Sequence, residues 1–297
     1  MSRLVRYAWF VLAFNVLVIL MGAIVRATGS GAGCGPSWPT CNGEVLPRLQ
    51  GAAAVEFSHR ALSGVALLLV FGLGVAVWRS VGKGHPARIG AVLAVVAIVV
   101  EALIGAAIVL SEWVADDASV ARAVSVPLHL VNTLFLLATL VLTAHWLSGG
   151  TRLDMKSNPK ATKWVVFGGL ALIAISATGA VTALADTLFP VEALDPEVAE
   201  SAHFLTRLRV IHPILAIIVA VIAWWASGLE GLKRSGSALA IPALVGVLLL
   251  SGLLNVVLGV PVWMQVVHLA LADALWIAYV LVSARALSVE KPVRVTP

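Results

Sequence analysis

The chain has 297 residues, of which 60% are hydrophobic and only 12% are charged, and its mean hydropathy is +1.01. These fractions lie outside the range of ordinary soluble domains and indicate an integral membrane protein. The net charge of +5 gives little support to nucleic-acid binding, because the basic residues follow the membrane topology described below.

Eight apolar runs are long enough to cross a membrane, since about 20 helical residues span the roughly 30 Å of hydrocarbon. The sequence therefore predicts an all-α integral membrane protein with eight transmembrane helices. The first run lacks a small-residue cleavage site and exceeds the core of a signal peptide, so we expect it to be retained. The runs cover residues 7–27, 58–78, 87–111, 123–147, 162–183, 207–228, 237–258 and 263–287.

Charge is distributed unequally between the two sides of these helices. An even number of spans puts both termini on one side, where basic residues cluster, whereas acidic residues gather opposite. The positive-inside rule then predicts a multi-pass protein of the cell membrane with cytoplasmic N- and C-termini. The basic residues on the terminus side are Arg3, Arg6, Arg79, Lys83, Arg88, Arg152, Lys156, Lys160, Lys163, Lys233, Arg234, Arg285, Lys291 and Arg294. The acidic residues opposite are Glu112, Asp116, Asp117, Asp186, Glu192, Asp195, Glu197 and Glu200.

The longest connection, residues 28–55, is rich in Gly, Pro and Trp and lies on the outer side of the predicted topology. It contains Cys34 and Cys41, the two cysteines of the chain, which are seven residues apart. An oxidising compartment favours a short-range disulfide between them. Two free thiols or a metal pair remain alternatives, although no third or fourth soft ligand occurs in this loop.

The second apolar run opens with ionisable and polar residues, which are costly to place at a membrane boundary. Glu56, His59, Arg60 and Ser63 are spaced by three or four residues, so a helix would bring them to one face. We therefore expect these four side chains to point into one cavity.

The two halves of the chain repeat one pattern. Residues 22–25, Gly-Ala-Ile-Val, at the outer end of the first run are echoed by residues 179–182, Gly-Ala-Val-Thr, in the fifth. The fourth and eighth runs share a histidine motif, and the second and sixth share a weaker one. The sequence thus predicts two four-helix bundles, residues 1–150 and 151–297, related by a pseudo-twofold axis along the membrane normal.

One histidine lies near the outer end of each even-numbered run, at a depth of roughly 6 to 10 Å. Paired within each half, His59 with His129 and His212 with His268, they could give two axial imidazoles to the iron of a flat macrocycle. Zinc and copper fit less well, since they need three or four converging ligands. A single membrane histidine is often only a hydrogen-bonded core residue, but four in register favour a shared role.

Arginines near these histidines are suited to bind carboxylates such as haem propionates. Arg207 and Arg209 precede His212, and Arg60 and Arg122 are the corresponding candidates in the first half. For each arginine, an extended position at the outer membrane surface is the alternative.

The two halves differ beside their histidines. Glu56 lies one turn from His59, whereas the equivalent place near His212 is Arg209. A carboxyl group there can shuttle protons or stabilise charge, so we expect chemistry in the first half and a closed haem site in the second. Further polar groups inside the spans are functional candidates, with hydrogen bonding between helices expected for the asparagines. They are Glu101, Asn132, Asn255 and Asp273.

These features together resemble the haem A synthase (CtaA-type) family, over residues 5–287. The combination of outer loop and glutamate–histidine–arginine motif is specific, whereas a histidine in the last run alone would be a weak signal. The features that carry the resemblance are the duplicated eight-span plan, Cys34, Trp38-Pro39, Cys41-Asn42-Gly43, Glu56-x-x-His59-Arg60 and the later histidines.

The resemblance implies an oxidoreductase that converts the C8 methyl group of haem O into the formyl group of haem A for terminal oxidases. It implies haem b as cofactor, a structural or redox role for the cysteine pair, and as partners membrane lipid, a haem O synthase, an electron acceptor or donor and further copies in a homo-oligomer. The implied residues are His212, His268 and Arg209 for the cofactor, His59, His129 and Arg60 for the substrate haem, and Glu56 and His59 for catalysis.

Two other classes of protein remain as alternatives. A bis-histidine membrane b-type cytochrome in quinone-linked electron transfer would use the same ligands, but many such proteins stack two haems across the bilayer, and here all four histidines lie on one side. A transporter built from parallel repeats would have helices broken at the midplane. Its hints are limited to Pro242 and the Gly168-Gly169 pair.

Overall fold

The computed structural model describes residues 2–48, 50–189, 204–227 and 240–288, with side chains left undescribed for 223–227. Within these residues it has eight helical segments long and apolar enough to cross a membrane, which confirms the predicted number. The helices are α1 (Arg3–Ala27), α2 (Gly51–Ser80), α3 (Pro86–Leu110), α4 (Val120–Leu147), α5 (Pro159–Leu188), α6 (Phe204–Leu208), α7 (Ile211–Ser227), α9 (Ala240–Val257) and α10 (Val262–Ala286).

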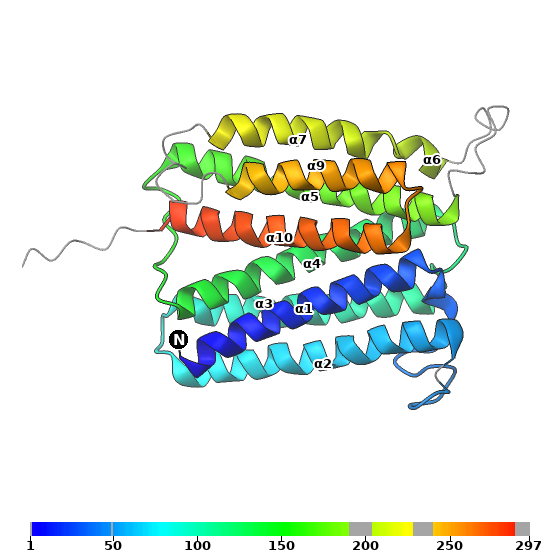
Figure 1. The fold of residues 1–297 in the computed structure, drawn as a ribbon. Helices are drawn as coiled ribbons and strands as arrows, with labels where there is room; N and C mark the ends of the chain where they lie inside the picture. Colours follow the sequence, from blue (N-terminus) through cyan, green and yellow to red (C-terminus); the bar gives the residue numbers. More distant parts are fainter. Residues whose placement is uncertain (1, 49, 190–203, 228–239, 289–297) are drawn as a thin grey trace, which may run out of the picture.

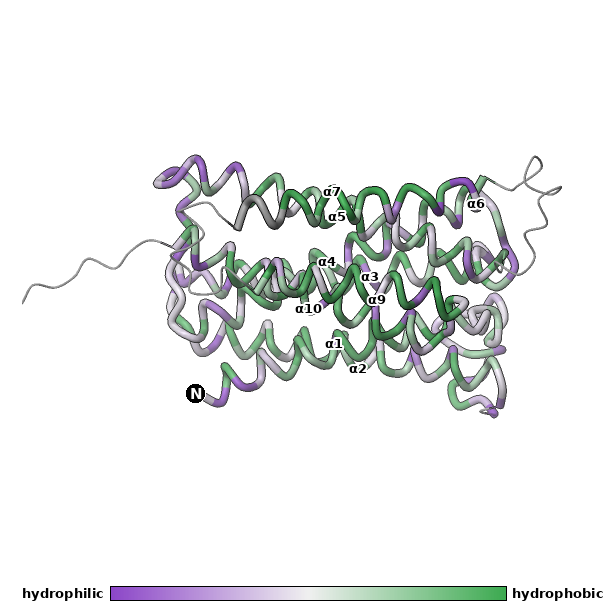
Figure 2. Tube along the Cα trace, turned by 45° about the horizontal axis from the view of Figure 1, so that its top comes forward, coloured by the Kyte–Doolittle hydropathy of each residue, from purple (hydrophilic) through white to green (hydrophobic). Residues whose placement is uncertain are grey.

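The helices lie side by side along a common direction (Figure 1). Figure 2 shows apolar residues along their middle and hydrophilic residues gathered at both ends, as a membrane-spanning bundle requires. The chain begins at the same end of the bundle at which α10 ends (Figure 1). There the connection between α4 and α5 meets the residues after α10, where Asp154 N donates to Leu287 O at 2.7 Å.

Within each half, the helices contact their neighbours in a closed ring. In the first half, α1 and α3 each contact both α2 and α4; in the second, α5 and α9 each contact both α7 and α10. Helices α1 and α4 also contact α5 and α10 across the seam between the halves. The pseudo-twofold relation between the halves stays a prediction.

Small residues let α3 and α4 approach closely, which matters because apolar side chains gain little from leaving lipid for protein. A Cβ added at Gly90 would lie 2.4 Å from Thr143 Oγ1 and 3.0 Å from the Trp146 ring, so the two helices touch at this position. The small buried residues on this side of α3 are Ala87, Gly90, Ala91, Ala94 and Ala97.

The second span begins earlier than predicted. Helix α2 starts at Gly51 and not at residue 58, so Glu56 lies inside the helix together with His59. The sequence pattern misplaced this start because the first turns are polar and small, and the hydrophobic signal begins only at Ala61.

The sixth span is interrupted, which the sequence analysis did not predict. Helix α6 ends at Leu208 and α7 begins at Ile211. Pro213 explains the break, because proline has no N–H to donate to the carbonyl four residues earlier, at Arg209. His212 therefore lies in the first turn of a new helix.

The outer connection between α1 and α2 is packed onto the start of α2. Cys34 and Cys41 form a disulfide, as predicted from their spacing and the oxidising side, and both side chains are fully buried. A Cβ at Gly33 would lie 2.4 Å from the backbone of Ala52, so only glycine permits this close approach.

Several charged residues used in the topology prediction lie outside the described residues, and the orientation of the bundle in the membrane stays a prediction. They are Glu192, Asp195, Glu197, Glu200, Lys233, Arg234, Lys291 and Arg294.

Candidate functional site

Each of the four predicted histidines lies against a glycine of the preceding span. A Cβ built at Gly22 of α1 would lie 3.0 Å from the His59 ring on α2, and one at Gly179 of α5 would lie 2.9 Å from the His212 ring on α7. These two glycines occupy the matching positions of the sequence repeat, Gly-Ala-Ile-Val and Gly-Ala-Val-Thr. The repeat therefore places each ring against a neighbouring backbone.

The same arrangement occurs at the other two histidines, with more room. A Cβ at Gly252 of α9 would lie 3.3 Å from His268 on α10, and one at Gly105 of α3 would lie 3.8 Å from His129 on α4. All four histidines lie within about three turns of the outer start of their spans. The structure thus places the four rings at one end of the bundle.

In the second half, the rings of the two histidines lie close to each other. The ring centres of His212 and His268 are 6.4 Å apart with an interplanar angle of 83°. Each Nδ1 atom is already engaged: that of His212 lies 3.1 Å from Ile175 O, and that of His268 lies 2.8 Å from Ser251 Oγ. The two Nε2 atoms are therefore the ones available to a metal.

This geometry fits a pair of axial ligands. Two metal–nitrogen bonds of about 2.0 Å, plus about 1.1 Å from each nitrogen to its ring centre, would separate the centres by roughly 6.2 Å. The observed 6.4 Å between His212 and His268 agrees with this value. Hydrogen bonds at Nδ1 also fix ring orientation, as is usual for metal-ligating histidines. Among the described residues, no group of three or more His, Cys, Asp or Glu side chains converges as a metal site.

In the first half, His59 and His129 lie near enough to interact electrostatically. His129 has an acidic neighbour, because Glu101 Oε1 of α3 lies 3.2 Å from His129 Nδ1. Asn132 Nδ2 donates to Ala97 O at 3.0 Å and to Glu101, which confirms the predicted hydrogen bonding between helices at this asparagine. The Oδ1 atom of Asn255, in contrast, has no partner among the described residues.

Glu56 is only 3% exposed and both of its carboxylate oxygens are engaged. Oε2 accepts the backbone N–H of Cys34 at 2.7 Å, and Oε1 pairs with the Arg60 guanidinium. Arg60 also donates to Ser37 O, at 2.6 Å, and to Thr40 O. Glu56 and Arg60 therefore bind the disulfide loop to α2, whereas the His59 ring lies against α1.

Arg209 and Arg122 likewise bond to nearby outer backbone. Arg209 Nη2 donates to Ala185 O and Phe189 O, and its Nε lies 2.8 Å from Asp186 Oδ1. Its Nη1 has no partner among the described residues. Arg122, 4% exposed, donates to Ala115 O and to Asp117 O. Both arginines thus keep a guanidinium nitrogen without a hydrogen-bond partner among the described residues, Nη1 in Arg209 and Nε in Arg122.

Sequence reasoning missed Arg26, which joins the halves. Its guanidinium donates to Ala183 O at 2.6 Å and Thr187 Oγ1 at 2.7 Å on α5, and to Gln265 Oε1 at 2.8 Å on α10. A lone arginine at the outer end of the first apolar run was the available signal. The partners could not be predicted, since they lie more than 150 residues away.

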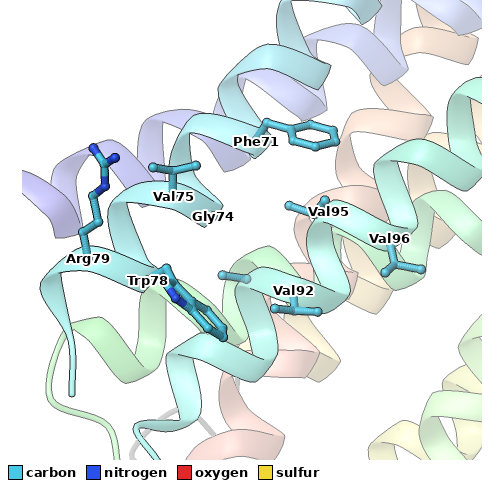
Figure 3. A pocket seen from close by; sticks show the side chains of 9 residues that line it. Phe71, Gly74, Val75, Trp78, Arg79, Val92, Val95 and Val96 are labelled. Atoms are coloured by element: carbon cyan, nitrogen blue, oxygen red, sulfur yellow. The ribbon is translucent and has the colours of Figure 1, made fainter. Parts of the chain in front are cut away.

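Two apolar cavities lie away from the second histidine pair. One, of about 690 Å³, lies at the seam of the halves between α3, α4, α5 and α10, where Asn132 and Trp276 contribute to its wall. The other, of about 320 Å³, lies between α2 and α3 near their inner ends, with Trp78 and Arg79 at its rim (Figure 3). Asn132 brings the first cavity next to the Glu101 contacts.

Fold and site define a class, a multi-span membrane protein with paired histidines near one end of the bundle. A family model described as COX15-CtaA, cytochrome oxidase assembly protein, matches residues 5–280. The chain belongs to this family, which confirms the resemblance inferred from the sequence.

Individual relatives carry two different names. The chain is 49% identical over 296 residues to a "Protoheme IX farnesyltransferase" of Thermus thermophilus, covering 96% of this chain and 49% of that protein. It is 43% identical over 94 residues to the "Heme A synthase" of Bacillus licheniformis, covering 32% of this chain and 31% of that one. With the Staphylococcus haemolyticus "Heme A synthase" it shares 32% over 162 residues, 54% and 52% of the two chains. The chain spans about half the length of the Thermus relative.

Proposed function

We propose that this chain is a haem A synthase, an oxidoreductase that converts the C8 methyl group of haem O into the formyl group of haem A. The observation that carries the proposal is the His212–His268 pair, whose ring separation would suit two imidazole ligands of one haem iron. Family membership and the matched segments of proteins named Heme A synthase support the same reaction.

The second half, residues 151–297, is the proposed site of the cofactor haem b. His212 and His268 hold it through Nε2, since both Nδ1 atoms have other partners. Arg209 Nη1, which has no partner among the described residues, is suited to donate to a propionate. When bound, this haem supplies a one-electron redox centre.

The first half, residues 1–150, is the proposed site of the substrate, haem O, held by His59 and His129 with Arg60 nearby. Two successive hydroxylations of the methyl group give a hydrated aldehyde, which loses water to leave the formyl group. Each hydroxylation adds one oxygen atom and removes two electrons from the carbon. If water supplies the oxygen, an external acceptor takes the two electrons and two protons are released; if O2 supplies it, an external donor gives two electrons, and with two protons the second oxygen atom leaves as water. Glu56 assists by moving a proton. Since both of its oxygens now accept bonds, it must first exchange the Cys34 N–H or Arg60.

The proposed setting of this reaction is the cell membrane, with both termini in the cytoplasm. The histidine layer, which consists of His59, His129, His212 and His268, lies toward the outer side. A haem O synthase is the proposed supplier of substrate, and the name of the Thermus relative supports that link. Membrane lipid surrounds the spans, and a homo-oligomer is the proposed assembly.

Farnesyl transfer is a second candidate function, because the Thermus relative is named for it and matches almost the whole chain. That relative is about twice as long, so the named activity can reside in the part that this chain does not match. Supplying the purified chain with haem b and farnesyl diphosphate separates the two functions. Haem O as product would favour the transferase, whereas haem A formed from added haem O favours the synthase.

The main experiment expresses the full chain with a haem O supply, records its absorption spectrum and separates the extracted haems by chromatography. We expect His212→Leu and His268→Leu each to abolish the low-spin haem b signal and haem A formation. His145→Leu, a histidine near the other end of α4, is the matched control and should keep both. Full haem b with unaltered spectra in both ligand variants would contradict the proposal, and haem b without conversion of haem O would leave a b-type cytochrome.

A further inference from the structure

His129 differs from the histidines of the second half in the group that lies next to its Nδ1 atom. Glu101 Oε1 is 3.2 Å from His129 Nδ1, a contact within ion-pair distance that does not have the geometry of a hydrogen bond. In the second half, the Nδ1 atom of His268 instead lies 2.8 Å from the hydroxyl of Ser251, a neutral group. Among the described residues, His129 is the member of the histidine layer that has a carboxylate in contact.

Glu101 is itself oriented by side chains of α4. Thr133 Oγ1 donates to Glu101 Oε1, and Asn132 Nδ2 donates to Oε2. Thr133 Oγ1 also lies 3.0 Å from His129 O, so its single proton is shared between Glu101 and the histidine backbone. A carboxylate within a membrane span is costly unless it is paired, so this set of partners points to a specific use of Glu101.

We propose that Glu101 is a positioning residue of the substrate site, an inference that rests on the proposed function. Its carboxylate keeps Nδ1 of His129 turned away from the substrate and leaves Nε2 for the haem iron. A carboxylate behind a metal-ligating histidine fixes the ring and raises its basicity as a ligand. Stronger donation stabilises the oxidised iron, so the substrate haem has a lower midpoint potential than neutral partners alone would give.

The test is a potentiometric titration of the purified full chain loaded with haem b and haem O, followed by absorbance. Glu101→Gln removes the charge and keeps the size, so we expect the potential of the first-half haem to rise while that of the second-half haem stays constant. Thr133→Val keeps the carboxylate and should shift the potential less. Ser251→Ala is the matched control in the second half and should leave the first-half haem unchanged.

A Glu101→Gln protein that retains first-half haem at an unchanged potential would overturn the inference and leave Glu101 as a link between α3 and α4. A shift as large in Thr133→Val as in Glu101→Gln would overturn it too, because the effect would then follow the network and not the charge. If Glu101→Gln loses the haem, retention in Glu101→Asp at a potential near that of the unaltered chain supports it, and loss there overturns it. Absence of first-half haem from the unaltered chain would instead refute the proposed function and this inference with it.

Discussion

At the residue scale, Glu56 has two roles. It holds the outer loop on α2, and it is also the proposed acid–base group. Glu56→Gln keeps a hydrogen-bond acceptor for the Cys34 N–H but removes the charge that pairs with Arg60. We expect haem b and haem O uptake to persist while haem A formation falls by roughly 10² to 10⁴-fold, the usual effect of losing a positioned acid or base. Chromatography of extracted haems measures this, with accumulation of a hydroxymethyl intermediate as an added sign.

The paired control for Glu56 is Arg60→Gln, which breaks the same ion pair from its other side. If the role of Glu56 is only to hold the loop, the two variants should lose activity to a similar degree. Near-normal haem A from Glu56→Gln would show that the carboxyl group has no chemical role.

The glycines next to the histidine rings allow a prediction in which the loss of haem depends on the distance between an added Cβ and the ring. Gly179→Ala would place a methyl group 2.9 Å from the His212 ring, so the imidazole must turn or the helices must separate. We expect Gly179→Ala to lose most of the haem b signal and Gly252→Ala, at 3.3 Å from His268, to lose less. Haem content per protein, from the absorption spectrum, measures the series.

Gly246→Ala is the control for this series, because a Cβ there meets nothing within 4 Å. It should keep full haem content and gain up to about 1 kcal/mol of helix stability. Equal haem loss in all three variants would mean that the glycines serve helix packing in general and not the histidine rings.

At the scale of elements, the outer loop between α1 and α2 is a small folded unit closed by the disulfide. The Cys34→Ser and Cys41→Ser double variant opens a loop of about eight residues, for which chain-entropy models give roughly 2 to 3 kcal/mol. We expect a lower thermal midpoint and faster proteolysis within residues 28–50, while the eight spans persist. The single variant Asn42→Gly, which loses one hydrogen bond to Gly33 O and suits the left-handed backbone at this position (φ 53°), should have a smaller effect.

Opening this loop should also change the position of Glu56 in the proposed substrate site, because Glu56 accepts the Cys34 N–H. A double cysteine variant with unaltered proteolysis and thermal midpoint would show that Glu56, Arg60 and the packing at Gly33 hold the loop without the bridge. Mass spectrometry of unreduced peptides provides the check that the bridge exists in the unaltered protein.

For the whole molecule, the orientation in the membrane is the outstanding prediction. The connection between α4 and α5 carries Arg152 and Lys156, and Lys160 lies in the first turn of α5, so a reporter fused after Gly150 should be cytoplasmic. A reporter fused after Gly43, in the disulfide loop, should be on the outer side. The opposite pair of results would invert the topology and put the disulfide in a reducing compartment.

The seam between the halves is also a property of the whole molecule. Arg26 reaches from α1 to α5 and α10, and Trp276 Nε1 of α10 donates to Leu134 O of α4 at 2.7 Å. The proposed cofactor and substrate sites are thus joined by side-chain hydrogen bonds and helix contacts. Electron transfer between the two proposed haem sites would need a constant distance between them. The contacts across the seam would keep the two halves at such a distance.

The membrane class, the eight spans and the repeat could be predicted from the sequence, and so could the disulfide and the common end of the four histidines, both of which are present in the structure. Length and apolarity decide whether a helix spans a membrane, and the repeat of Gly22 and Gly179 with their histidines is visible as a motif. These signals are local, because each depends on residues that are neighbours along one helix or one loop.

The contacts of the polar side chains, in contrast, could not be predicted without the packing of the helices. Glu56 and Arg60 turned toward the loop and His59 toward α1, although one helix face carries all three. Glu101 of α3 contacts His129 of α4, and Arg26 donates to residues of the second half. Such contacts depend on how helices rotate and pack against one another, and periodicity along one chain segment holds no information on the rotation of its neighbours.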